Sequence, residues 1–250
     1  MKKSMLLIAI APAALLICCG KNSSSPSATT TTVVPAVYSK IYGASSITTD
    51  GTWVTIKSTG LPDYKSCYYP TTNALYEAFS GTKTFADSTF AQNPNTIAAA
   101  SYTFKIPLNP AEASTHASTP LGPIGVSLNG VPFYNQYNGS DNPLTVEINS
   151  FDQGWGHPDP GSHYHYHVEP IKLTTAKGED ALMGFLLDGF PVYGPYENGT
   201  LVPASSLDEY HGHFGATADY PNGIYHYHIS SSAPYINGDG FYGTAGTVSQ

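Results

Sequence analysis

Short stretches of alternating apolar and polar residues recur along most of this chain. TWVTIKS at 52–58 and SYTFKIP at 101–107 alternate with a period of two, which is typical of β-strands with one buried face. Glycine and proline interrupt the pattern every few residues, and helical spacing is confined to short segments at 73–79 and 205–210. The pattern predicts one domain over 37–250 that is all-β, or β-rich α+β with very short helices.

Three blocks of sequence occur twice in the same order, which predicts an internal duplication. The pairs are IGVSLNGVPFYN (124–135) and MGFLLDGFPVYG (183–194), SFDQGWGH (150–157) and SLDEYHGH (206–213), and YHYH at 164–167 and 225–228. The offsets between partners are similar but not identical, as expected if loops of different length join equivalent strands. We therefore predict two copies of one unit, 123–170 and 182–230.

The first block of each copy has the signature of a tight β-hairpin. Asn129-Gly130 in one copy and Asp188-Gly189 in the other lie between two short apolar stretches. Asn-Gly and Asp-Gly supply the positive φ angles that two-residue turns require. We predict a hairpin in each copy, and a pseudo-twofold axis that relates the copies within a β-sandwich or barrel-like domain.

The tetrapeptide YHYH near the end of each copy separates its side chains into two kinds. Successive side chains of a strand point to opposite faces, so the histidines fall on one face and the tyrosines on the other. The tyrosines predicted to be buried are Tyr164, Tyr166, Tyr225 and Tyr227, and the histidines predicted to line a cleft are His165, His167, His226 and His228. If the copies pack on each other, these histidines should share one pocket.

Two histidines at positions i and i+2 of a strand can converge on one metal ion, with further donors supplied by the rest of the fold. The candidate metal ligands are His157, His165, His167, His213, His226, His228, Asp152 and Asp208. These donor types favour zinc or copper(II). Either the copies share one ion or each copy holds its own. Protons should displace the metal between about pH 5 and 6, because the unperturbed histidine pKa is about 6.5.

A metal-free interpretation of the same residues stays open from sequence alone. Asp152 and Asp208 are suited to capping short turns or helices. The histidines are suited to hydrogen bonding with tyrosine hydroxyls and backbone carbonyls.

The charge balance narrows the range of partners. The formal net charge is −8 at pH 7, and the chain contains no arginine. An acidic protein without guanidinium groups is a poor match for phosphate backbones, so we expect no nucleic-acid partner. Cys67 is the one cysteine beyond the N-terminal segment, so no intramolecular disulfide is expected in the folded part.

The N-terminal segment has the features of an export signal. Two lysines precede an apolar run, and LLICCG follows. We predict a signal peptide over 1–18, a lipid on Cys19 and a flexible Ser/Thr/Pro-rich linker over 19–36. The protein should then be exported and anchored at the bacterial cell envelope, at the outer membrane or cell surface, with membrane contact through this lipid only.

Five ordered motifs carry a resemblance to a known family. They are IGVSLNGVPFYN, FDQGWGHPDPGSHYHYHVEP, GFLLDGFPVYGPY, LDEYHGHF and GIYHYHISSSAPYINGDGFYG. Over about 100–243 the chain resembles the YHYH-domain family of exported bacterial and algal proteins. The resemblance implies no particular activity, because the family is named after a motif and not a reaction.

Three functions remain compatible with the sequence. The preferred one is an exported, lipid-anchored domain that binds zinc or copper. The second is a metal-free surface module for a sugar, peptide or other small molecule, with stacking by Trp53, Trp155, Tyr166, Tyr193, Tyr196 and Tyr227. The third is a metal-dependent hydrolase, in which the metal activates water. Nucleophilic catalysis is not favoured, since the chain has no G-x-S-x-G motif.

Overall fold

β-strands dominate the regular structure of residues 33–250, the part of the chain that this computed structural model describes. The predicted signal peptide, the lipidation of Cys19 and most of the predicted linker lie outside the described residues. Within residues 33–250, no helix has the length and apolar character that a membrane crossing requires.

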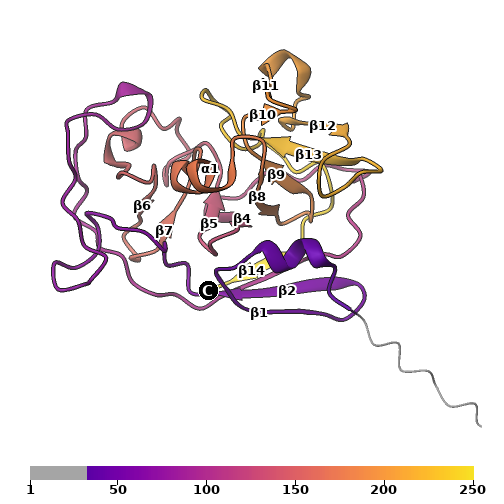
Figure 1. Cartoon of the computed structure of the whole chain (residues 1–250), viewed down its shortest axis with the longest axis horizontal. Helices are drawn as coiled ribbons and strands as arrows, with labels where there is room; N and C mark the ends of the chain where they lie inside the picture. The colour runs from indigo at the N-terminus through magenta and orange to yellow at the C-terminus, as the bar shows by residue number, and fades with distance from the viewer. Residues whose placement is uncertain (1–32) are drawn as a thin grey trace, which may run out of the picture. The chain divides into compact units, whose positions relative to one another are not determined.

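The elements follow one another along the chain as short strands joined by turns (Figure 1). The strands are β1 (Ala44–Thr49), β2 (Trp53–Ser58), β3 (Tyr102–Pro107), β4 (Pro123–Ser127), β5 (Pro132–Tyr134), β6 (His157–Pro158), β7 (Tyr164–His165), β8 (Leu182–Leu186), β9 (Pro191–Tyr193), β10 (Tyr196–Glu197), β11 (Thr200–Leu201), β12 (Gly212–Gly215), β13 (Ile224–His228) and β14 (Thr247–Ser249). The helical segments are η1 (Ala36–Lys40), η2 (Phe85–Asp87), η3 (Glu147–Ser150), α1 (Ile171–Lys177) and η4 (Ala204–Ser206).

The prediction of a β-rich fold with very short helices is confirmed. Strands β2 and β3 occupy the two alternating stretches that the sequence singles out. Residues 73–79 form a bend, a turn and an isolated bridge at Tyr76 but no helix, and η4 is one short 3-10 turn at the second predicted site. Helix α1 has no counterpart in the predicted pattern, although Pro170 and Gly178 flank it as helix-limiting residues.

Two sheets enclose one hydrophobic core. Strands β1, β2, β3 and β14 form a four-stranded sheet in the order β1-β2-β3-β14. Val54 and Phe104 on that sheet, and Val126 and Phe185 on the larger sheet, are fully buried members of the same cluster. This arrangement agrees with the sandwich-like alternative. The barrel-like alternative is wrong, since neither sheet closes on itself in the described part of the chain.

The larger sheet carries the duplication. Its order is β12-β13-β9-β8-β4-β5, and a parallel bridge between Phe133 and Tyr166 extends it toward β7 and β6. Strand β4 pairs antiparallel with β8 through Gly125 and Leu186, Val126 and Phe185, and Ser127 and Gly184. An offset of 59 residues makes Gly125 equivalent to Gly184, and Val126 to Phe185, so exchanging the two copies reproduces the same strand pairing. The predicted pseudo-twofold axis therefore passes between Val126 and Phe185.

The same symmetry keeps the two YHYH segments apart. Strands β9, β8, β4 and β5 lie between β13 and β7, and Figure 1 shows β6 and β7 on one side of them and β12 and β13 on the other. Five inter-strand steps of about 4.8 Å place the segments roughly 24 Å apart. The prediction of a single histidine pocket is therefore wrong. The copies pair through their hairpins, and the YHYH segments lie on the outer sides.

Both predicted hairpins form as expected. Strand β4 pairs antiparallel with β5, and β8 with β9. The turn glycines Gly130 and Gly189 have φ angles of 81° and 85°, which residues with a side chain rarely adopt. The dipeptides Asn129-Gly130 and Asp188-Gly189 thus place equivalent strands on either side of the pseudo-twofold axis.

Replacing Gly184 by alanine should destabilise the fold, because this residue lies where the two copies pair. A Cβ there would lie 2.2 Å from the backbone oxygen of Val126 and 2.6 Å from Cε2 of Phe133. We expect a loss of about 2 kcal/mol in the free energy of unfolding, measured by denaturant titration. Gly139→Ala is the control, since a Cβ at that exposed glycine meets no atom within 4 Å. Equal effects at both glycines would contradict this packing.

Candidate metal centres

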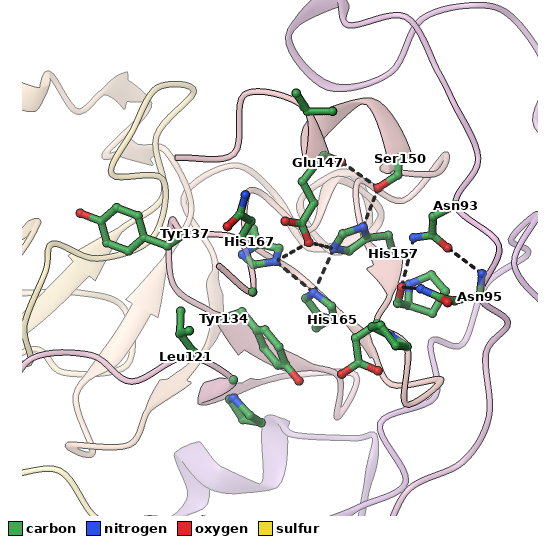
Figure 2. A pocket seen from close by; sticks show the side chains of 18 of the residues that line it. Asn93, Asn95, Leu121, Tyr134, Tyr137, Glu147, Ser150, His157, His165 and His167 are labelled. Carbon is green, nitrogen blue, oxygen red and sulfur yellow. Dashed lines mark hydrogen bonds and ion pairs between the residues drawn. The ribbon is translucent and has the colours of Figure 1, made fainter. Parts of the chain in front are cut away.

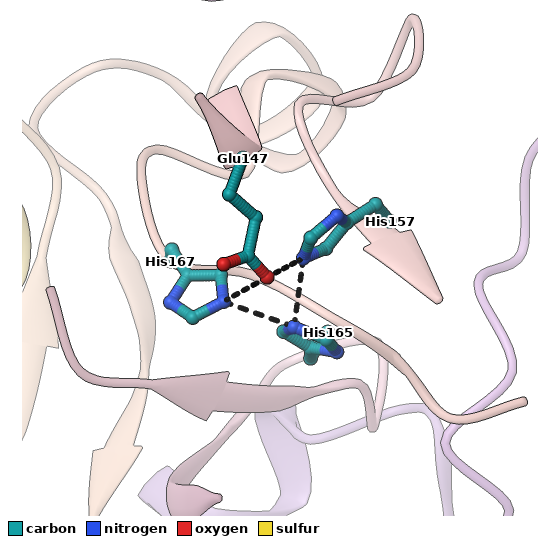
Figure 3. Close-up of side chains that lie close together, drawn as sticks. All are labelled: Glu147, His157, His165 and His167. Atoms are coloured by element: carbon teal, nitrogen blue, oxygen red, sulfur yellow. Dashed lines mark hydrogen bonds and ion pairs between the residues drawn. The ribbon is translucent and has the colours of Figure 1, made fainter. Parts of the chain in front are cut away.

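The first candidate centre gathers four side chains from three short elements (Figure 3). Glu147 comes from η3, His157 from β6, and His165 and His167 from β7 and the residues after it. Strands β6 and β7 pair with His157 directly opposite His165, which brings their rings together. The turn before β6 includes Trp155 with a φ angle of 60°.

The donor atoms of this first centre have the spacing of ligands around one ion. The Nε2 atom of His165 lies 3.0 Å from the Nε2 atoms of both His157 and His167. Oε1 of Glu147 lies 3.2 Å from Nε2 of His157 and 4.0 Å from Nε2 of His167. A tetrahedral zinc ion with bonds of about 2.0–2.1 Å separates its ligand atoms by about 3.3 Å. The observed distances therefore suit a tetrahedral ion.

Hydrogen bonds determine which ring nitrogens carry protons. The Nδ1 atom of His165 lies 2.9 Å from the carbonyl oxygen of His163, and Nδ1 of His167 lies 2.5 Å from that of Asn135. A carbonyl only accepts hydrogen bonds, so both Nδ1 atoms are protonated and donate. The Nε2 atoms of the neutral rings are then unprotonated, and their lone pairs face each other at 3.0 Å.

The third histidine of the first centre is oriented in the same way. The hydroxyl of Ser150 donates to the carbonyl oxygen of Glu147 at 2.7 Å, so its oxygen accepts from Nδ1 of His157 at 2.6 Å. In the neutral ring, Nε2 of His157 is therefore also unprotonated and carries a lone pair. Three lone pairs and one carboxylate converge without a donor between them, which is unfavourable unless a cation lies among them.

The second candidate centre repeats this arrangement in the other copy. It combines Glu197 of β10, His213 of β12, and His226 and His228 of β13, with donor atoms within 4.8 Å of one another. Nε2 of His213 lies 3.1 Å from that of His228. Oxygens of Glu197 lie 3.8 Å from Nε2 of His213 and of His226. The donor set is the same as in the first centre, and its shortest carboxylate distance is longer, 3.8 Å against 3.2 Å.

The orienting carbonyls are equivalent in the two copies. Nδ1 of His226 donates to Ile224 at 3.0 Å, and Nδ1 of His228 donates to Gly194 at 2.8 Å. At the repeat offsets, Ile224 corresponds to His163 and Gly194 to Asn135. Nε2 of His226 is buried, yet it has no hydrogen-bond partner among the described residues. This unpaired lone pair lies beside three other potential ligand atoms, an arrangement that could hold a metal ion.

A comparison with models of protein families identifies the family to which the chain belongs. A family model described as "YHYH protein" matches residues 103–205 and 197–240, which together span both repeats and all ligand residues of both candidate centres. The chain belongs to the YHYH protein family. The resemblance noted in the sequence is thereby confirmed. No match was found for this YHYH protein among curated proteins or among solved structures.

The two aspartates predicted as ligands lie outside both centres of this YHYH protein. Asp152 is fully buried and accepts hydrogen bonds from the hydroxyls of Ser66 and Tyr164 and from the backbone N–H of Gly154. Burial raises the pKa of Asp152, and these hydrogen bonds oppose the increase. All of its oxygens point toward the turn and the core, so the structure does not bring it to the metal ligands.

Asp208 has the equivalent role in the second copy. It accepts from the hydroxyl of Tyr225 at 2.9 Å and from the backbone N–H groups of Tyr210 and Gly212. It thus braces the turn before His213, as Asp152 braces the turn before His157. The turn-capping role considered from sequence describes both aspartates better than a ligand role.

The glutamates of both centres were not found from the sequence. Glu147 precedes His157 by 10 residues, whereas Glu197 precedes His213 by 16, and neither belongs to a repeated block. One lies on a 3-10 helix and the other on a hairpin strand. The two glutamates therefore reach equivalent positions from segments that differ in length and structure. A search for sequence repeats does not detect such an equivalence.

The predicted separation of tyrosines and histidines in the YHYH segments is confirmed. Tyr164, Tyr166, Tyr225 and Tyr227 are buried. Their hydroxyls bond to Asp152, Tyr64, Asp208 and Asp188, respectively, and not to the histidine Nε2 atoms. The metal-free arrangement is therefore met in part among the described residues: backbone carbonyls accept from Nδ1 atoms of the histidines, whereas no tyrosine hydroxyl bonds to their Nε2 atoms.

The first centre opens onto a cavity of about 810 Å³. Figure 2 shows side chains that line this cavity. His157, His165 and His167 form part of its wall together with Glu147. His226 and His228 border a much smaller cavity of about 80 Å³. The histidines therefore line clefts as predicted, although in two places and of unequal size.

Burial favours the neutral form of the four YHYH histidines. Loss of solvent lowers the pKa of His167 and of His228 to about 4, with a further contribution from neighbouring histidines. It also lowers the pKa values of His165 and His226. Neutral imidazoles are the form that binds metal, so protons should compete at lower pH than the range of 5 to 6 expected from an unperturbed histidine.

The metal-free protein should lose stability on acidification between about pH 6.5 and 4. In this range the buried histidines stay neutral in the folded state but bind protons in the unfolded state. Stability is then complete above the unfolded pKa and falls as the pH approaches the folded pKa, by about 1.4 kcal/mol per pH unit for each such histidine. Urea titrations of chelator-treated protein at several pH values measure this slope. A flat profile would contradict buried neutral histidines.

Proposed function

We propose that this YHYH protein binds two transition-metal ions, one in each repeat. The main support is that unprotonated Nε2 atoms of several histidines converge. The Nδ1 atoms of the same rings donate to backbone carbonyls or to Ser150. A set of neutral rings of this kind has no hydrogen-bond donor among its converging atoms, and a metal ion that accepts their lone pairs would satisfy them. The same donor set in both copies supports a common role inherited through the duplication.

Zinc or copper(II) is the proposed metal. Three imidazoles and one carboxylate form a donor set that both ions accept. Soft sulfur donors, which favour copper(I), do not contribute: Cys67 is buried away from both groups, and burial raises the pKa of its thiol to about 12. The tetrahedral spacing in the first centre favours zinc.

The metal-free binding module receives less support. Three of the six aromatic residues that it needs for stacking, Tyr166, Tyr193 and Tyr227, are buried in the core. They offer no face to a sugar or peptide. Metal binding also accounts for the orphaned Nε2 atom of His226, which the module leaves unexplained.

We propose further that the protein is exported and anchored by a lipid at the bacterial cell envelope. The support is the N-terminal sequence alone: a basic start, an apolar run and LLICCG, with Cys19 as the lipid attachment site. The lipid is the only membrane contact proposed. The net charge of −8 and the lack of arginine argue against a nucleic-acid partner and favour attraction of cations.

Elemental analysis tests the metal proposal. Protein purified without a histidine tag, stripped with a chelator and dialysed against zinc or copper(II), should retain about two ions per chain. The count follows from two complete donor sets on one chain. Protein that retains neither zinc nor copper after this treatment would refute the proposal and promote the metal-free module.

A further inference from the structure

The two candidate centres share a donor set but differ in the space around it. The first borders a cavity of about 810 Å³ and the second a cavity of about 80 Å³. The smaller cavity lies well below the range of about 300–1,000 Å³ that is typical of small-molecule sites. The larger one falls in the range of small-molecule binding sites.

The chemistry of the large cavity restricts what it accepts. At its mouth, Leu121 is 48% exposed and Val146 is 75% exposed, so two apolar side chains border the entrance. Figure 2 places Tyr134, Tyr137 and Leu121 around the space beside the histidines. Glu147 and Asp159 are its acidic residues, and no lysine is among the described residues that line it. A polyanion is therefore disfavoured, whereas an apolar group is well matched.

The charge at the metal determines the polar part of the ligand. A divalent ion with three neutral histidines and one carboxylate retains a net charge of +1. One anionic donor neutralises it, and some zinc sites accept a fifth ligand. The matching ligand has an apolar body and a single anionic oxygen or nitrogen donor.

We propose that the metal of the first repeat is a binding site for such an organic ligand, whereas the metal of the second repeat borders a cavity too small for the ligand's apolar body. The inference rests on the proposed metal binding and adds a division of roles between the copies. In the first repeat, the ligand donor reaches the ion between the histidines, and its apolar body lies in the cavity against Leu121 and Val146. The second site has the same donors and no space for that body.

Cobalt(II) provides a visible signal for the test. The full chain and two variants, each with one intact centre, are loaded with Co²⁺, and bound cobalt is counted. The variants are His226→Ala/His228→Ala, which keeps the first centre, and His165→Ala/His167→Ala, which keeps the second. Phenylacetate and acetate are then titrated while the visible absorption of cobalt is recorded.

Phenylacetate should bind the first centre at least about tenfold more tightly than acetate, because its apolar ring is transferred from water into the cavity. At the second centre it should show no such preference. Leu121→Asp/Val146→Asp should remove most of the preference at the first centre. Leu201→Asp, at an exposed leucine outside the cavity, should leave it unchanged.

The possible failures are distinguishable. A chain that binds no cobalt refutes metal binding and this inference together. Cobalt at both centres with an equal phenylacetate preference, or with no spectral change at the first centre, refutes the division of roles and leaves metal binding standing.

Discussion

Replacing His165 and His167 together by alanine should remove one of the two metal ions and leave the other in place. The change deletes two of the four donors of the first centre, and the remaining Glu147 and His157 are too few to hold the ion. The second centre lies on the far side of four intervening strands, roughly 24 Å away, and shares no ligand with the first. Metal content should therefore fall from about two ions to about one per chain.

Two further variants serve as controls for this loss. His226→Ala/His228→Ala should remove the other ion and give the same count. His163→Ala should retain both ions, because His163 lies just before β7 but pairs with Asp159 and belongs to neither group. Loss of all metal from either double variant would indicate one shared site, and unchanged content would show that these histidines bind no metal.

Replacing Asp152 by alanine should lower the free energy of unfolding of the metal-free protein by about 3 kcal/mol. The change leaves the hydroxyls of Ser66 and Tyr164 and the N–H of Gly154 without their acceptor inside the core. Unsatisfied buried donors of this kind cost about 1–3 kcal/mol each, partly recovered by relaxation. Denaturant titration in the presence of a chelator measures the loss without any contribution from metal.

Asp208→Ala is the matched control, since Asp208 has the same place in the second repeat but is exposed to solvent. Because Asp208 is exposed, water can enter the space that its carboxylate leaves and bond to its partners, so the expected loss is about 1 kcal/mol. Equal losses at both aspartates would contradict the burial argument. A metal-free Asp152→Ala protein as stable as the parent would restore the ligand role that the sequence suggested.

The sequence predicted the strands and the histidine face because both depend on local periodicity. Alternation in 52–58 and 101–107 reports which side chains meet the core, and the structure buries those faces in β2 and β3. The same reasoning separated the YHYH tyrosines from the histidines. Repeats also revealed the pseudo-twofold axis, since equivalent hairpins pair about it.

The parts that the sequence did not predict depend on contacts between distant segments. Pairing of β4 with β8, and not of the two YHYH segments, separates the centres, and no local pattern encodes that choice. Glu147 and Glu197 reach their centres from loops of different length. Asp152 and Asp208 have the right chemistry for metal but are held by tyrosine hydroxyls, which only the folded arrangement reveals.

The duplication has kept the donors while changing their surroundings. Ser150 holds His157 in the first repeat, whereas the corresponding Ser206 is exposed and bonds to the carbonyl oxygen of Pro203. His157 is 3% exposed and His213 is 25% exposed. The first centre is therefore the more tightly held, and the second is more open to water.

Anomalous X-ray diffraction from crystals grown with zinc, recorded at the zinc absorption edge, tests the central claim most directly. Two strong peaks should appear, one among Glu147, His157, His165 and His167 and one among Glu197, His213, His226 and His228. Each peak should lie about 2.0–2.2 Å from its nitrogen and oxygen ligands. No peak at either group, or a single peak between the repeats, would contradict two metal centres of this kind.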